Sequence, residues 1–94
     1  MMGTYKVILS PIAQSDIEKV EKSGQKSTYK KILVLLDELS QHPHFGTGQP
    51  ELLRNTENQL WSRRVDKKNR MVYSIKENIV TVHVFSILGH YEDK

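Results

Sequence analysis

The chain contains no cysteine, and this absence is the most restrictive feature of its composition. It excludes a disulfide framework, a thiolate metal site and a cysteine nucleophile, and it fits a reducing compartment such as the cytoplasm. The sequence also lacks long apolar runs, so it offers no membrane span, and its N-terminus lacks the apolar region of a secretory signal. We therefore expect a cytoplasmic protein that does not contact membranes.

What is present suits one small globular domain. The chain has 94 residues, of which 37% are hydrophobic and 27% are charged, without repeats or linkers. We expect residues 1–94 to form a single domain. The net charge of +3 is modest, but one short stretch concentrates the cations: Arg63, Arg64, Lys67, Lys68 and Arg70.

The N-terminal half predicts a strand followed by two helices. The β-branched and aromatic run at 4–10 is typical of a strand. Ser10 followed by Pro11 predicts the start of the first helix, and Gly24 predicts its end. Ser27 is expected to cap the second helix, whose apolar face is predicted from spacing: Tyr29, Ile32, Leu33, Leu36 and Leu39.

The C-terminal half predicts a long loop at 42–58 and then three strands. These strands cover 60–65, 70–75 and 79–88, and the last places Val80, Val82 and Val84 on one aliphatic face. Short turns between them predict an antiparallel meander. The expected fold is therefore α+β in the order βααβββ, an antiparallel sheet with both helices packed on one face.

The cations of the 63–70 stretch fall on two predicted strands and the turn between them. Because both helices cover one face of the sheet, some of these side chains are expected on the open face. The planar fork of arginine suits phosphate oxygens and favours a polyanionic ligand. A solvated set of charges that protects the sheet edge is the competing interpretation, and it stays open for Lys67 and Lys68 in the turn.

Two side chains are candidates for proton transfer. Histidine is the usual donor near neutral pH, and His90 follows the last predicted strand, from where it can reach over the open face. Glu51 lies in the long loop, where Pro50 and two leucines are expected to hold it near the sheet. From the residues alone, a plain surface interpretation is preferred for both, and more strongly for Glu51 than for His90.

The other titratable residues favour structural interpretations. His42 and His44 are only two possible metal ligands, so polar residues at a helix end are the preferred interpretation. His83 is expected to be a half-exposed strand residue. The carboxylates of the two predicted helices are interpreted as surface charge: Glu18, Glu21, Asp37 and Glu38.

Three segments in order carry a resemblance to a known family. They are PELLR at 50–54, WSRRVDKKNRMVY at 61–73 and GHY at 89–91. Together they resemble the corresponding segments of YoeB-type toxins, in the RelE superfamily of bacterial toxin–antitoxin systems. Order and spacing match from Gly46 to Tyr91, and the resemblance implies a RelE-like fold.

The resemblance also implies an activity, a ribosome-dependent mRNA interferase that cuts the messenger in the decoding site of the 70S ribosome. By that resemblance Glu51 matches the general base and His90 the general acid. Arg70 matches the arginine at the scissile phosphate, and Tyr91 matches the tyrosine beside the acid. The basic residues expected to contact RNA are Arg54, Arg63, Arg64, Lys67 and Lys68.

The implied partners follow from the same family. They are a YefM-like antitoxin that covers the site, the ribosome with its mRNA, and operator DNA bound only together with the antitoxin. Such toxins are usually described as dimers, so a homodimer in the bacterial cytoplasm is expected.

The implied chemistry is cleavage by the RNA's own 2′-hydroxyl. A base removes the proton of this hydroxyl, its oxygen attacks the adjacent phosphorus, and an acid protonates the leaving 5′-oxygen. Arginines stabilise the added negative charge, so no metal or other cofactor is expected. Two alternatives stay open: a gyrase-directed toxin of related fold, against which Glu51, Arg70 and His90 argue, and a non-catalytic nucleic-acid-binding module.

Overall fold

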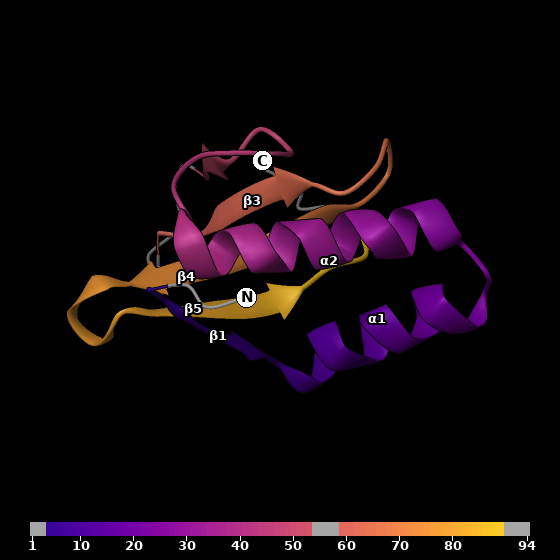
Figure 1. Ribbon diagram of the computed structural model, residues 1–94, viewed down its shortest axis with the longest axis horizontal. Helices are drawn as coiled ribbons and strands as arrows, with labels where there is room; N and C mark the ends of the chain where they lie inside the picture. Colours follow the sequence, from indigo (N-terminus) through magenta and orange to yellow (C-terminus); the bar gives the residue numbers. More distant parts are fainter. Residues whose placement is uncertain (1–3, 54–58, 90–94) are drawn as a thin grey trace.

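The computed structural model describes residues 4–53 and 59–89. Figure 1 shows two helices lying on the same face of one sheet, which confirms the α+β prediction with both helices on one side. The elements, in chain order, are β1 (Lys6–Leu9), α1 (Pro11–Lys22), α2 (Lys26–Gln41), β2 (Glu51–Leu52), β3 (Trp61–Arg64), β4 (Arg70–Lys76), the 3-10 helix η1 (Glu77–Ile79) and β5 (Thr81–Ser86).

The sheet is mixed, with the strand order β1-β5-β4-β3-β2. The pairs β2–β3, β3–β4 and β4–β5 are antiparallel, as predicted, whereas β1 runs parallel to β5. The prediction of a wholly antiparallel sheet is therefore wrong in this detail. The connection that this parallel pair requires runs through both helices and through β2, β3 and β4. The alternation of β5 does not reveal the direction of its neighbour.

The segment predicted as a loop contains the short strand β2. Its residues, Glu51 and Leu52, pair with Ser62 and Trp61 of β3. A two-residue strand has no period to detect, because it exists only through the neighbour with which it pairs.

The start of α1 is as predicted. The Oγ of Ser10 accepts a hydrogen bond from the amide of Ala13 at 3.0 Å, and Pro11 is the first helical residue. The same hydroxyl donates to the carbonyl oxygen of Phe85 at 2.6 Å, which ties the cap to the end of β5. The cap prediction for α2 is wrong, because this helix begins at Lys26 and contains Ser27.

The buried face of α2 differs from the predicted one. Ile32 and Leu39 are fully buried as expected, but Leu35 is buried in place of Leu33, which is 45% exposed. Residues 32–36 are all apolar, so the sequence is compatible with more than one helical stripe. None of the described helices is long and apolar enough to cross a membrane.

The strand β5 covers Thr81–Ser86, so it begins two residues later and ends two residues earlier than the predicted strand at 79–88. Val80 adopts a left-handed conformation, with φ of +47°, and closes the turn that follows η1. It is partly exposed, whereas Val82 and Val84 are buried in the core as predicted. The alternating face therefore consists of two valines of this strand, not three.

Candidate nucleic-acid interface

Neighbouring arginines of β3 lie on opposite faces of the sheet. Arg63 pairs with Met71 and Arg64 pairs with Arg70 across the β3–β4 hairpin. Paired residues share a face and successive residues alternate. Because Arg63 bonds to Glu38 of α2, the Arg64–Arg70 pair lies on the face that α1 and α2 leave open.

Glu51 and Arg70 meet on this open face. The Nη1 of Arg70 donates a hydrogen bond to the Oε1 of Glu51, with a separation of 3.3 Å. The side chain of Arg70 is 35% exposed and that of Glu51 is 63% exposed, so both are accessible to a ligand. A shallow depression here is lined by Gly48, Gln49, Glu51, Ser62, Arg64 and Arg70.

Gly48 permits the loop to approach β3 closely. Its carbonyl oxygen accepts a hydrogen bond from the amide of Arg64 at 2.6 Å. Its φ is +86°, and a Cβ at this position would lie 2.8 Å from the carbonyl oxygen of Arg64. Glycine therefore meets both a conformational and a steric requirement at the rim of the depression.

The turn between β3 and β4 presents two lysines. Lys67 and Lys68 are exposed, and the Oδ1 of Asp66 accepts hydrogen bonds from the amides of Lys68 and Asn69, both at 2.8 Å. Burial raises the pKa of the Asp66 carboxyl, but bonds from Asn69 and Lys68 outweigh this and hold it below its usual value. The turn is thus ordered while its two cations stay in solvent.

The segment that follows β5, as far as Gly89, is held beside Arg70. The amide of Arg70 donates to the carbonyl oxygen of Gly89 at 3.1 Å, and the amide of Gly89 donates to the Oδ1 of Asn69 at 2.7 Å. The buried Asp16 of α1 accepts from the amide of Ile87 at 2.9 Å. These contacts fix the backbone that precedes His90.

Three predicted site residues, Arg54, His90 and Tyr91, lie outside the described residues. The structure therefore brings together Glu51, Arg64 and Arg70 from the predicted set.

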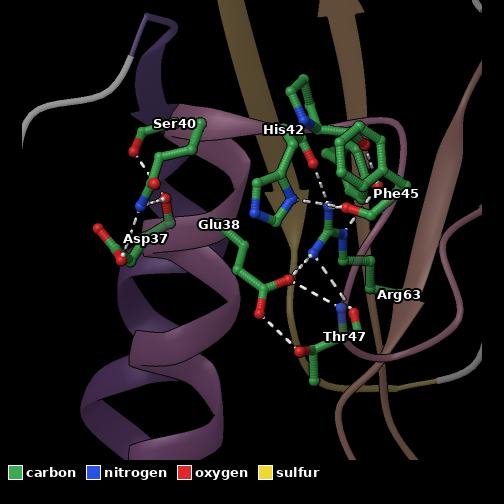
Figure 2. A network of polar contacts seen from close by, with 10 residues as sticks. Asp37, Glu38, Ser40, His42, Phe45, Thr47 and Arg63 are labelled. Carbon is green, nitrogen blue, oxygen red and sulfur yellow. Dashed lines mark hydrogen bonds and ion pairs between the residues drawn. The ribbon is translucent and has the colours of Figure 1, made fainter.

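Arg63 is a correction to the predicted RNA-contacting set. Its side chain is fully buried, and its Nη1 lies 2.8 Å from the Oε1 of Glu38. Its Nη2 donates to the carbonyl oxygens of His42 and Phe45, both at 2.8 Å. Figure 2 shows the guanidinium enclosed by these groups, so it is not placed to bind RNA.

The interpretation of Glu38 as surface charge is also wrong. Its carboxylate accepts hydrogen bonds from the amide and hydroxyl of Thr47 as well as from Arg63 (Figure 2). Burial raises the pKa of this carboxyl, but the bonds from Thr47 and Arg63 outweigh that effect and leave it below its ordinary value of 4.5. Glu38 is therefore the anionic partner that a buried guanidinium requires.

The histidines of the loop serve separate contacts. The Nδ1 of His42 lies 2.8 Å from the carbonyl oxygen of Phe45, and the Nε2 of His44 lies 2.7 Å from the Oε2 of Glu77. Among the described residues, no three histidine, aspartate or glutamate side chains are grouped as a metal site would require. His83 is half-buried in β5, as expected.

Sequence reasoning missed three residues that organise this region: Asp16, Glu38 and Asn69. A weak signal existed for the first two. Asp16 interrupts an otherwise apolar helical stripe of α1, and Glu38 directly precedes the buried Leu39. Asn69 gave no signal beyond its place in a turn.

Comparison with known sequences gives a consistent result. A sequence model described as "YoeB-like toxin of bacterial type II toxin-antitoxin system" matches residues 12–91. Toxin YoeB of Synechocystis sp. is 30% identical over 71 residues, which cover 76% of this chain and 80% of that protein. Toxin RelK of Mycobacterium tuberculosis is 33% identical over 60 residues, 64% of this chain and 71% of that protein.

Solved structures share the fold over nearly the whole chain. The YoeB/ParE toxin from Agrobacterium tumefaciens has a TM-score of 0.82 at 26% identity, over 92% of this chain and 99% of that one. The YoeB dimer from Staphylococcus aureus has a TM-score of 0.80 at 27% identity, over 95% and 100%. A heterotetrameric YoeB–YefM toxin–antitoxin complex from Staphylococcus aureus has a TM-score of 0.76 at 28% identity, over 93% and 98%.

Proposed function

The chain belongs to the YoeB-like toxins of bacterial type II toxin–antitoxin systems, and from this premise we propose that it is a ribosome-dependent endoribonuclease that cuts mRNA in the ribosomal A site. One observation carries the proposal. Glu51 of β2, Arg64 of β3 and Arg70 of β4 line one open depression. A carboxylate and two guanidinium groups in one accessible place suit cleavage at a phosphodiester.

In the proposed mechanism, the carboxylate of Glu51 takes the proton of the 2′-hydroxyl, whose oxygen then attacks the adjacent phosphorus. Arg70 and Arg64 stabilise the negative charge that develops on the phosphoryl oxygens. The bond from phosphorus to the 5′-oxygen breaks, and His90 gives its proton to that oxygen. The products are a 2′,3′-cyclic phosphate and a 5′-hydroxyl.

The contacts of Gly89 support the role of His90. Gly89 is bonded to the backbone of Arg70 and to the side chain of Asn69, and His90 is the next residue in the chain. A proton donor attached directly to this anchor starts from the edge of the proposed site. Tyr91 is proposed to act beside His90.

The remaining basic residues are proposed to hold the RNA backbone. Lys67 and Lys68 are exposed at the tip of the β3–β4 hairpin, where they can contact phosphates of mRNA or ribosomal RNA. Arg54 is proposed for the same role, and buried Arg63 is left out. No metal ion is required by this scheme.

The partners are proposed from the relatives. The Staphylococcus aureus structures are described as a YoeB dimer and as a YoeB–YefM complex. We therefore infer that the protein forms a homodimer and binds a YefM-like antitoxin in the cytoplasm. An acidic segment of this antitoxin is proposed to cover Arg64 and Arg70. Operator DNA would be bound only by the toxin together with its antitoxin.

The test uses an mRNA in which the 2′-hydroxyl 5′ to the cut is replaced by hydrogen. Programmed 70S ribosomes carrying this message should bind the toxin as before, because the phosphates remain, but cleavage should stop. The unmodified message should yield an upstream fragment ending in a 2′,3′-cyclic phosphate. Product ends are read by mass spectrometry, with the unmodified message as the control.

Two outcomes would contradict the proposal. Full cleavage of the deoxy-substituted message, or an upstream 3′-hydroxyl end, would show that the 2′-oxygen is not the nucleophile. Intact mRNA, together with arrested replication after induction in cells, would instead support the gyrase-directed alternative. Binding without any cleavage or toxicity would support a nucleic-acid-binding module.

A further inference from the structure

The loop from His42 to Gly48 is gathered around one guanidinium. Arg63 donates to the carbonyl oxygens of His42 and Phe45 at 2.8 Å and of Thr47 at 3.3 Å. Its Nε lies 3.2 Å from the hydroxyl of Tyr73, which donates to the carbonyl oxygen of Pro43 at 2.9 Å. A single side chain of β3 thus provides hydrogen-bond donors to three carbonyl groups of the loop.

Glu38 secures the other side of the same loop. Its carboxylate lies between the guanidinium of Arg63 and Thr47 (Figure 2), whose amide donates to it at 2.8 Å. Because Glu38 belongs to the last turns of α2 and Arg63 to β3, their pair joins the helix layer to the sheet. The loop passes over this junction.

The loop leads directly to the proposed base. Gly48 is bonded to the amide of Arg64, and three residues later Glu51 begins β2. This strand has only two residues, both exposed, so its own ladder fixes its position weakly. The position of the Glu51 carboxylate relative to Arg70 therefore depends on where the loop is held.

A buried ion pair is seldom the most stable solution for a core, because well-packed apolar residues are often as stable or more so. What this pair adds is a directional set of donors and acceptors, which selects one loop conformation. We propose that Arg63 and Glu38 are positioning residues that hold the 42–48 loop so that Glu51 lies within reach of Arg70 and the scissile phosphate. This inference rests on the proposed function, in which Glu51 is the general base.

The test uses Glu38→Gln, which keeps the size of the side chain but removes one of its acceptor oxygens toward Thr47. In single-turnover cleavage on programmed ribosomes, we expect the rate constant to fall about 10- to 100-fold, because displacement by about 1 Å is enough for such a loss. Affinity for the ribosome should change less than about twofold, because no phosphate contact is removed. The matched control is Glu18→Gln, at an exposed glutamate of α1, which should cleave like the wild type.

A double-mutant cycle separates positioning from a general structural role. If Glu38 acts through Glu51, then Glu38→Gln should have no further effect on the residual rate of Glu51→Ala. The same fold-loss in both backgrounds would overturn the proposal. A second variant, Thr47→Val, removes the hydroxyl that donates to Glu38 and should reproduce the rate loss in smaller measure; wild-type rates in both variants would also overturn it.

A readout independent of cleavage keeps the inference apart from the proposed function. The amides of Arg64 and Leu53 are bonded to Gly48 and Leu60 on either side of Glu51. By hydrogen exchange, Glu38→Gln should expose these two amides faster, while the amides of β4 and β5 keep their protection. Unchanged exchange would overturn the inference; a wild-type protein that cuts no mRNA would overturn only the proposed function.

Discussion

Arg63 and Arg64 are adjacent in sequence and occupy opposite physical environments. On the helix-facing side of β3, Arg63 is fully buried and donates hydrogen bonds to Glu38, Tyr73 and the loop backbone. On the open side, Arg64 is exposed and lines a depression with Glu51 and Arg70. The comparison teaches that one residue type can organise the fold on one face of a strand and line an accessible depression on the other. Which of the two it does depends on the face to which its position in the strand directs the side chain.

The largest expected effect comes from removing a cation on the open face. Arg70→Ala should lower single-turnover cleavage about 10²- to 10³-fold, because one stabilising donor is lost at the developing charge. Its ion pair with Glu51 is largely exposed, so the free energy of unfolding should change by less than about 1 kcal/mol. Arg70→Lys keeps the charge but lacks the planar guanidinium, so its cleavage rate should lie between those of the wild type and Arg70→Ala. Unimpaired cleavage by Arg70→Ala would show that this face is not catalytic.

The converse test removes a cation on the buried face. Arg63→Met should lower the free energy of unfolding by about 3 kcal/mol, because Glu38 is left without its partner. The matched variant Arg64→Met should change it by no more than about 0.5 kcal/mol. Urea unfolding of both proteins measures the contrast, and equal losses would mean that the two environments do not differ energetically.

Acid should remove the contribution that Glu38 makes to the stability of the buried face. The folded-state pKa of Glu38 is below 4.5, so its contribution to stability is complete above the unfolded pKa and is lost as pH falls through the folded value. Glu38→Gln should therefore be less stable than the wild type at neutral pH, and the difference should shrink below about pH 4. Urea unfolding at neutral pH and below about pH 4 tests this, with Glu18→Gln as the control. If the wild type and Glu38→Gln differed in unfolding free energy by the same amount at both pH values, Glu38 would not be the carboxylate that stabilises the buried face.

The smallest effect is expected at the hairpin tip. Lys67→Ala removes one exposed, replaceable point charge, so affinity for the ribosome should fall only about two- to threefold and the salt dependence should lose about one ion. Binding titrations at several salt concentrations measure both, with exposed Lys30 of α2 as a control site. A loss as large as that of Arg70→Ala would place the tip lysines in the chemistry itself.

Much of the fold was predictable because its signals are local. The Ser10–Pro11 start of α1 and the three C-terminal strands are encoded by adjacent residues. The two-residue strand β2, by contrast, is defined by its pairing with β3. The direction of β1 relative to β5 likewise depends on the tertiary arrangement, so local patterns could not reveal it.

The part of the candidate site on β3 was predictable only as far as local alternation determines it. The alternation of β3 dictates that Arg63 and Arg64 face opposite ways, but it does not say which of them faces the helices. That assignment depends on Glu38, which is 25 residues away in sequence. The prediction treated the arginines as one basic patch and so overlooked the alternation of side chains along β3. It also treated Glu38 as solvated and so overlooked its bond with Arg63.

The parallel pairing of β1 with β5 has a consequence for biosynthesis. β1 is the first strand to leave the ribosome, yet the sheet neighbour to which it bonds is the last to be made. Such long-range pairing slows folding, because a large loop must close before its contacts form. The sheet therefore cannot be completed until β5 has been synthesised, so β1 lacks its strand partner while only β1 to β4 exist.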